Sequence, residues 1–338
     1  MYNANYMSTK LRWHNDDKLV ALQEDVDLAA LKQFAPLLLK RAFSETLIHG
    51  NMSKNNAESI LLTFEKSLGI HPLRSGELTP TARCVKFPGL AGAHHIHRQA
   101  GPDPENPESS IKTDFQLDPN GHPSGYGGFT SELEMTAALS LLSHLMKEPC
   151  YDILRTKEQL GYMVWSGASR NNGVGSLWFI IQSPEKGPAM LDNRVEAFLE
   201  HFYENVLKNM TEETFTSNVQ ACVLTRTKKD VSLYHQSDRF WKQVENQSYL
   251  FNRSFDMAKA LESLKHEQII GLFERYVKKD GSNRNKLTAQ IVGKGREEID
   301  RPLFEAQVAA GATVVGGDIA SMDQFKARCS LFPAVGEN

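Results

Sequence analysis

The sequence lacks the long apolar runs and the strong net charge that mark two large classes of protein. No run approaches the roughly 20 apolar residues that a membrane-spanning helix needs, and the polar start MYNANYMSTKLRWHNDD has no signal-peptide core. The formal net charge is only -3, whereas proteins that neutralise nucleic-acid phosphates usually carry a strongly basic domain. We therefore expect a soluble, non-secreted protein that binds neither membranes nor nucleic acids.

Cysteine is also scarce. The four cysteines, Cys84, Cys150, Cys222 and Cys329, are widely spaced and form no C-x-x-C pair, which disfavours both a disulfide framework and a zinc knuckle. This usage is typical of reduced thiols, so it predicts a cytoplasmic location.

Complete catalytic motifs are missing as well. The stretch at His266 begins like H-E-x-x-H but has Ile270 where the second histidine should stand, and the one at His144 lacks the last histidine of the inverted H-x-x-E-H pattern. Neither G-x-S-x-G nor G-x-G-x-x-G occurs. These absences disfavour a nucleotide-binding doubly wound fold and predict no complete active site in this chain.

What is present is an ordinary globular composition, with 41% hydrophobic and 23% charged residues over 338 positions. This length favours one complete domain plus a piece of another. The Gly, Pro and Ser density of GIHPLRSGELTPTA indicates a connection, so we expect a boundary near residue 80. The small-residue-rich stretch after Arg301 predicts a C-terminal arm.

Hydrophobic periodicity predicts an alternation of strands and helices. Helices are expected from Asp27, bent by Pro36, and from Ser53, with a strand and turn at 42–51 between them. Further strands are expected at 83–87, 93–99, 110–117, 161–168, 176–183 and 285–294, and further helices at 131–149, 195–206, 211–223, 233–244 and 266–277. Loops are expected at 101–108 and 118–128. The pattern favours an α+β fold: a mostly antiparallel sheet with helices packed on one face.

Three groups of residues are candidates for chemistry. His94, His95 and His97 lie close together, and His95 and His97 would share one face of a strand, but no third ligand is evident, so a solvated strand is the favoured interpretation.

The other two groups each contain an arginine. Arg226, Lys228 and Lys229 are candidates for binding a polyanion, against the alternative of a solvated helical face. In EPCYDILRTKEQLGYMVWSG, Arg155 offers a forked donor for carbonyls and Tyr162 a phenol for an oxyanion; a purely structural role is the alternative.

This last motif carries a resemblance. Together with GSLWFIIQS, RVEAFL and MTEETF downstream, it resembles the C-terminal half of the pitrilysin (M16) family of zinc metallopeptidases. The resemblance extends upstream through LLLKRAFSETLIHGNMSK and covers most of the chain, least clearly at 101–128 and 300–320.

The resemblance implies four similar α+β domains that form two halves around a chamber. Residues 1–80 would be the end of the third domain plus a linker, residues 81–300 the fourth domain, and residues 301–338 a C-terminal arm. Zinc would be bound by residues absent from this chain, so no metal ligands are expected here and the chain alone should be inactive. A non-catalytic binding or scaffold subunit with the same fold is the alternative function.

The resemblance also implies roles for single residues. Arg155 would hold the backbone carbonyls of a peptide substrate, Tyr162 would stabilise the oxyanion formed during hydrolysis, and Tyr151 would line a pocket. The implied partners are peptide substrates and the N-terminal half of the same enzyme, while a homodimer stays open. The cluster at 226–229 lies where a member of the family has a polyanion-binding patch, but it is less basic.

Overall fold

The structure is a computed structural model that describes residues 2–38, 40–78, 82–88, 92–117 and 129–334. It divides into two units, which are described separately. The larger consists of Met1–Lys10, Arg83–Lys228 and Asn252–Pro333, and the smaller of Leu11–Ala82, Lys229–Phe251 and Ala334–Asn338. The loop predicted at 118–128 lies outside the described residues. Within the described ranges, no helix has the length and apolarity that crossing a membrane requires.

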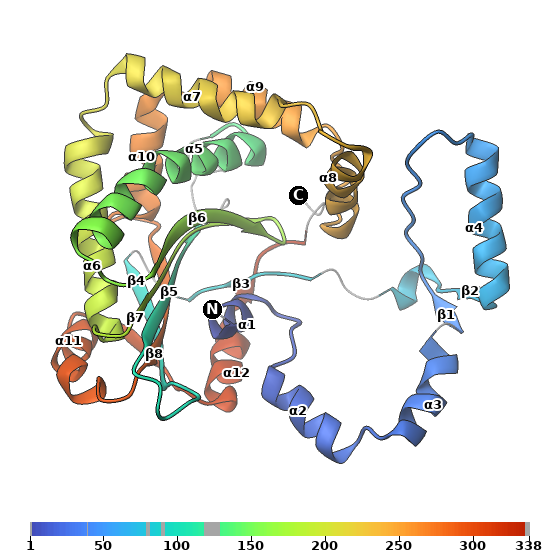
Figure 1. Cartoon of the computed structure of the whole chain (residues 1–338), viewed down its shortest axis with the longest axis horizontal. Helices are drawn as coiled ribbons and strands as arrows, with labels where there is room; N and C mark the ends of the chain where they lie inside the picture. Colours follow the sequence, from blue (N-terminus) through green and yellow to red (C-terminus); the bar gives the residue numbers. More distant parts are fainter. Residues whose placement is uncertain (1, 39, 79–81, 89–91, 118–128, 335–338) are drawn as a thin grey trace. The chain divides into compact units, whose positions relative to one another are not determined.

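A mixed sheet organises the larger unit (Figure 1). Among the described residues, six strands pair in the order β6-β7-β5-β8-β4-β9. Their bounds are β4 Ala93–Ala100, β5 Ser109–Leu117, β6 Met163–Asn171, β7 Val174–Ser183, β8 Asn285–Val292 and β9 Thr313–Val315. The pairs β6–β7, β7–β5 and β5–β8 are antiparallel, whereas β4 runs parallel to β8 and β9. The predicted α+β fold with a mostly antiparallel sheet is therefore confirmed.

The larger helices cover one face of this sheet. They are α5 Glu132–Cys150, α6 Pro188–His201, α7 Glu212–Thr227, α9 Arg253–Ser263, α10 His266–Tyr276 and α11 Glu297–Ala309. Because side chains alternate along a strand, Phe115 of β5 and Phe179 of β7 point the same way and meet Phe198 of α6, with neighbouring ring centroids 6.2 Å apart. These rings lie in the main hydrophobic core, which buries the apolar stripe of α5.

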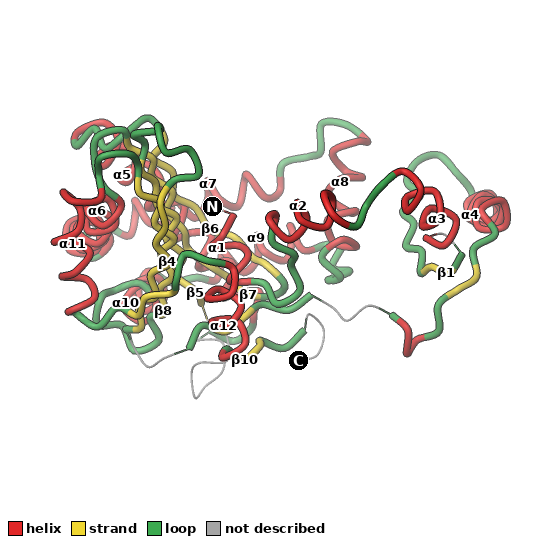
Figure 2. The backbone as a smooth tube through the Cα atoms, turned by 90° about the horizontal axis from the view of Figure 1, so that it is seen from below, coloured by secondary structure: helices red, strands yellow, loops and turns green. Residues whose placement is uncertain are grey.

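Two short helices lie on the opposite side of the strands (Figure 2). α1 (Tyr2–Ser8) and α12 (Ile319–Arg328) enclose a second core with Leu287 and Ala289 of β8. The short strands β3 (Val85–Lys86) and β10 (Ser330–Leu331) pair beside them. The segment expected to be an arm thus contains α12 and β9.

The smaller unit is mostly helical. It contains α2 Asn15–Glu24, α3 Leu28–Leu38, α4 Lys54–Leu68, α8 Leu233–Glu245, the strands β1 Arg41–Ala42 and β2 His71–Pro72, and a short 3-10 turn at Ser75–Glu77. Ser53 caps α4 as predicted, and Pro36 lies inside α3. The strand predicted at 42–51 is wrong: only Arg41 and Ala42 pair, with His71 and Pro72. A strand needs a partner, and β2 offers just two residues.

The structure also contains elements that the sequence did not predict. Helix α9 was not expected, although Met257 and Leu261 lie four residues apart on one buried face. Helix α5 ends at Cys150 as expected near Pro149, but the chain continues as a π-helical segment, η3 (Tyr151–Lys157). The predicted hairpin at 161–183 is confirmed as β6 and β7.

A buried ionic network joins the sheet to α6. Lys286 of β8 lies 2.8 Å from the Asp192 carboxylate and 2.5 Å from that of Glu196, and Lys286 and Asp192 are each only 1% exposed. Although burial opposes ionisation, Lys286 and Arg284 hold the pKa of Glu196 below its ordinary value. Asp192 also accepts from Thr113 and Thr288, so its oxygens are well satisfied. The network therefore fixes α6 on the sheet by charge as well as by packing.

We predict that Lys286→Met lowers the free energy of unfolding by about 3–5 kcal/mol, because it leaves buried carboxylates without their cation. The matched control is Lys294→Met, whose pair with Glu105 is exposed (53% and 76%) and should cost about 1 kcal/mol or less. Urea unfolding of both variants measures the difference. Equal shifts in the two variants would contradict the structural role of the network.

Candidate functional site

The candidate site begins where α5 changes its winding. Pro149 lies inside α5 and has no backbone N–H, so it removes one hydrogen bond of the regular ladder. The next turns are wider, and Glu158 N–H donates to the carbonyl of Ile153, five residues back, at 2.9 Å. Leu154 is fully buried and anchors this segment in the core. The π-helical winding thus carries Tyr151 and Arg155 beyond the end of the α-helix.

Arg155 lies between two tyrosine rings. Its guanidinium carbon is 5.6 Å from the ring centroid of Tyr151 and 5.8 Å from that of Tyr162. Both distances are within the range of cation–π attraction. Tyr162 is 86% exposed and Tyr151 51%. The structure therefore brings the three predicted site residues together, with the phenol of Tyr162 open to solvent.

The loop that presents Tyr162 is held at three points. Glu158 accepts two hydrogen bonds from Arg194 of α6, at 2.7 and 2.5 Å, and Leu160 is buried in the main core. At Gly161 the backbone of β7 approaches so closely that a Cβ would lie 1.8 Å from the Gln182 carbonyl oxygen. Only glycine fits there without a shift. Tyr162 is thus exposed but stands on a well-fixed loop.

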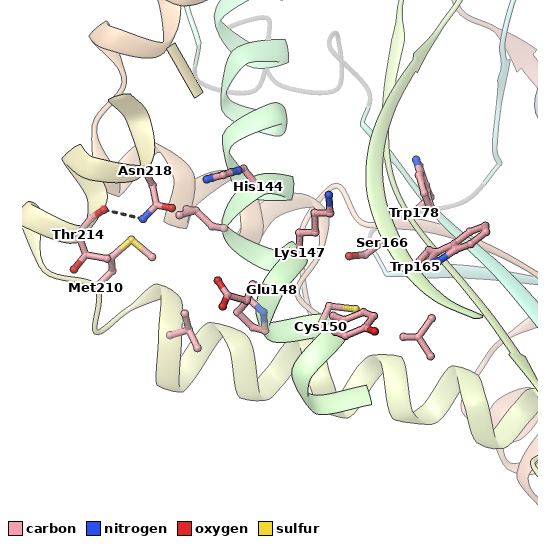
Figure 3. Close-up of a pocket in the computed structure, with 15 residues that line it drawn as sticks. His144, Lys147, Glu148, Cys150, Trp165, Ser166, Trp178, Met210, Thr214 and Asn218 are labelled. Carbon is pink, nitrogen blue, oxygen red and sulfur yellow. Dashed lines mark hydrogen bonds between the residues drawn. The ribbon is translucent and has the colours of Figure 1, made fainter. Parts of the chain in front are cut away.

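A pocket of about 750 Å³ opens beside Tyr151 (Figure 3). Trp165 of β6 and Trp178 of β7 form one wall, Lys147 of α5 lies next to them, and Asn218 of α7 closes the far end. Tyr151 is among the residues that line this pocket, and its role in binding a substrate stays a prediction. Sequence reasoning missed the two tryptophans, although their positions in facing strands of the predicted hairpin were a usable signal.

A second, smaller hollow lies on the other side of the site. Its volume is about 300 Å³, and Tyr162, Gly161, Gln182 and Glu108 are among its lining residues. Tyr151 borders the larger pocket and Tyr162 the smaller one, with Arg155 between their rings. This arrangement can accept an extended chain with a side chain in each hollow.

Cys150 forms part of the larger pocket but is only 1% exposed. Burial raises the pKa of its thiol to about 11, and a hydrogen bond with Ser166 opposes that shift only in part. The thiol is therefore protonated at neutral pH, and a thiol is a weaker nucleophile than a thiolate.

The three histidines of β4 do not form a metal site. His94 points toward α6, 3.6 Å from Asp192, and burial followed by the charge of Lys286 lowers the pKa of its imidazole to about 2. His95 and His97 share the opposite face, where His95 contacts the Pro88 carbonyl and His97 that of Gly316. Both side chains are buried, so the prediction of a solvated strand is wrong: this face of β4 is covered by the second core. In the part of the chain that the structure describes, no three His, Cys, Asp or Glu side chains are grouped to hold a metal. These residues therefore do not fit a catalytic zinc.

The basic cluster is only partly available for a ligand. Arg226 lies in the last turn of α7 and donates to the Ser140 hydroxyl of α5 at 2.9 Å. Lys228 and Lys229 follow the helix and are exposed. A polyanion-binding role for these three residues stays a prediction.

Comparison with known proteins gives the family. A family model described as PQQ synthase PqqF-like, C-terminal lobe domain 4, matches residues 141–241. Human insulin-degrading enzyme is 33% identical over 349 residues, which cover 99% of this chain and 32% of that protein. Human nardilysin is 28% identical over 291 residues, covering 86% of this chain and 24% of that protein. The chain thus spans about a third or less of the length of these relatives.

Solved structures agree on the fold. Pitrilysin matches with a TM-score of 0.76 and 19% identity, over 98% of this chain and 32% of its own. A protease from Helicobacter pylori matches with a TM-score of 0.54 and 16% identity, over 85% of this chain and 65% of its own. The chain therefore belongs to the pitrilysin (M16) family of metallopeptidases and corresponds to its C-terminal portion.

Proposed function

We propose that this chain is the zinc-free C-terminal portion of a metalloendopeptidase, which binds peptide substrates and completes the active site of an N-terminal portion. The grouping of Arg155, Tyr151 and Tyr162 beside two hollows supports the proposal. The Arg155 guanidinium has five N–H donors suited to peptide carbonyls, and the exposed Tyr162 phenol can donate to an oxyanion. In this proposal the N-terminal portion holds the zinc; among the described residues of this chain, no three His, Cys, Asp or Glu side chains are grouped to hold a metal.

The smaller unit suggests how the portions join. α2, α3 and α4 bury no residue among their described side chains. The exposed apolar residues of α3 and α4 include Leu31, Phe34, Ile60 and Phe64. Such faces usually pack against another part of a protein. We assign residues 1–80 to the end of a third M16-like domain with its linker, residues 81–300 to the fourth and residues 301–338 to a C-terminal arm.

Location and assembly follow the same proposal. All four cysteines are unpaired, which is expected of a protein in a reducing compartment, so we place the enzyme in the cytoplasm. Its main partner is the N-terminal portion of the same enzyme, and homodimerisation is left open.

Reconstitution tests the proposed function. The purified chain alone should not cleave a fluorogenic peptide, and adding a zinc-bearing N-terminal portion of an M16 enzyme should give cleavage that a chelator abolishes. In the reconstituted enzyme, Tyr162→Phe should lower kcat by about 100-fold to 1,000-fold, the loss that follows removal of one oxyanion donor. Tyr234→Phe is the control, because this tyrosine is 75% exposed on α8 and lies outside the proposed site.

Assembly must be measured beside activity. Co-purification of the two portions should be equal for the wild-type chain and for Tyr162→Phe, since the phenol is exposed. Cleavage by the chain alone would contradict the proposal. Stable assembly without any gain in activity would instead favour a non-catalytic binding or scaffold subunit with the same fold.

Gly161→Ala tests how Tyr162 is positioned. The added Cβ would meet the Gln182 carbonyl, so we expect a loss of about 1–3 kcal/mol of stability, typical of overpacking, and a lower kcat/KM after reconstitution. Gly271→Ala in α10 is the matched control, because no atom outside its own helix backbone and its chain neighbours lies within 4 Å of its Cβ position. It should raise stability by about 0.5–1 kcal/mol without affecting activity. Full activity of Gly161→Ala would contradict the positioning role.

A further inference from the structure

Strand β6 forms one edge of the main sheet. It pairs with β7 on one side, and no other described strand pairs with its outer side. The strand begins at Met163, directly after Tyr162. A long open edge beside a candidate site offers a row of backbone donors and acceptors to another chain.

The turn of the hairpin determines which backbone groups point outward. Asn172 and Gly173 have φ values of +45° and +86°, the two positive values of a type I′ turn. The closing pair, Asn171 and Val174, therefore exchanges hydrogen bonds, and so does every second pair from there. The residues between them direct their N–H and C=O groups to the open side: Val164, Ser166, Ala168 and Arg170.

The edge lacks most of the usual protection against pairing, and its charged residue, Arg170, is paired with Glu132 of α5. Its nine residues contain neither proline nor lysine, and the register with β7 runs without a bulge from Met163 to Asn171. The opposite edge of the sheet is different, because β9 has only three residues. A regular edge with so little protection is a template for an added strand.

Side-chain space lies along the same edge. The smaller hollow is bordered by Tyr162 and Met163, and the larger pocket by Val164, Trp165 and Ser166. Trp165 is 50% exposed. A strand laid along β6 would thus pass both hollows and reach Tyr162.

We propose that the open edge of β6 binds an extended peptide as an additional strand, and that this pairing guides the peptide to Arg155 and Tyr162. The proposal rests on the proposed function, since it takes the occupant to be the peptide substrate. The outward N–H and C=O groups supply affinity that is independent of sequence, and the two hollows select side chains. A small number of main-chain hydrogen bonds, each contributing modestly, holds the peptide in register.

Binding to the purified 338-residue chain tests the pairing without any need for activity. The probe is a fluorescein-labelled heptapeptide in which threonine alternates with valine and tyrosine, followed by fluorescence anisotropy. Single N-methylation is then moved along the peptide. Because a docked strand donates to β6 only from alternate residues, methylation at one parity should weaken binding roughly ten-fold or more, and at the other less than about two-fold. Equal effects at all positions would overturn the proposal.

Ala168→Pro tests the protein side. Its N–H points away from β7, so proline removes a donor of the open edge without breaking the hairpin ladder. Binding should fall roughly ten-fold or more, whereas Ala168→Val, which keeps the N–H, should bind within about two-fold. Thermal unfolding checks that both variants are folded. If Ala168→Pro does not fold, the N-methylated peptides with the wild-type chain decide the proposal.

Two further outcomes are informative. If the parity test fails while Tyr162→Phe still impairs the reconstituted enzyme, the edge proposal alone is overturned. Sedimentation velocity tests the other occupant. A dimer that Ala168→Pro dissociates and that excludes the probe would make the edge a self-pairing surface and overturn the proposal.

Discussion

The close contact between Gly161 and the Gln182 carbonyl is the constraint on which the candidate site depends. It fixes the point where the chain leaves the helical layer and enters β6, because no side chain fits between the two backbones. Leu160, buried on the core side, holds the same turn from within. Tyr162 is therefore exposed on a well-fixed loop, as its proposed role in stabilising an oxyanion requires.

The sequence predicted most of the larger unit because its periodic signals agree with its tertiary packing. The apolar stripe of α5, the hairpin β6–β7 and the strand β8 all have patterns that the core then buries. The pairing partners of the strands were harder to predict, because nothing in the sequence of β4 itself indicates that it lies parallel to β8 and β9. The prediction of a strand at 42–51 was wrong for the same reason, because a segment with strand propensity forms a strand only beside a pairing partner.

The sequence nominated the members of the candidate site but not their geometry. Arg155 and Tyr162 came from a motif and a resemblance, whereas their stacking depends on the π-helical turns after Pro149. In a regular α-helix each residue is rotated by about 100° about the helix axis relative to the residue before it. The wider π-helical turns change this rotation and therefore the direction of every later side chain. The pattern of residues after Pro149 does not by itself predict that change in winding. For the histidines the sequence predicted the geometry instead. His95 and His97 do share one face of the strand, but each contacts a backbone carbonyl.

The groups described at the candidate site suit the proposed role of holding a peptide. Arg155, the two tyrosines, the hollows and the open edge of β6 are all groups that bind or orient. Two side chains beside these groups are engaged elsewhere: burial raises the pKa of the Cys150 thiol, and Glu158 is paired with Arg194. Oxyanion stabilisation accelerates a reaction only when another group attacks the carbonyl. Under the proposed function, this portion orders the substrate and the attacking group comes from another part of the enzyme.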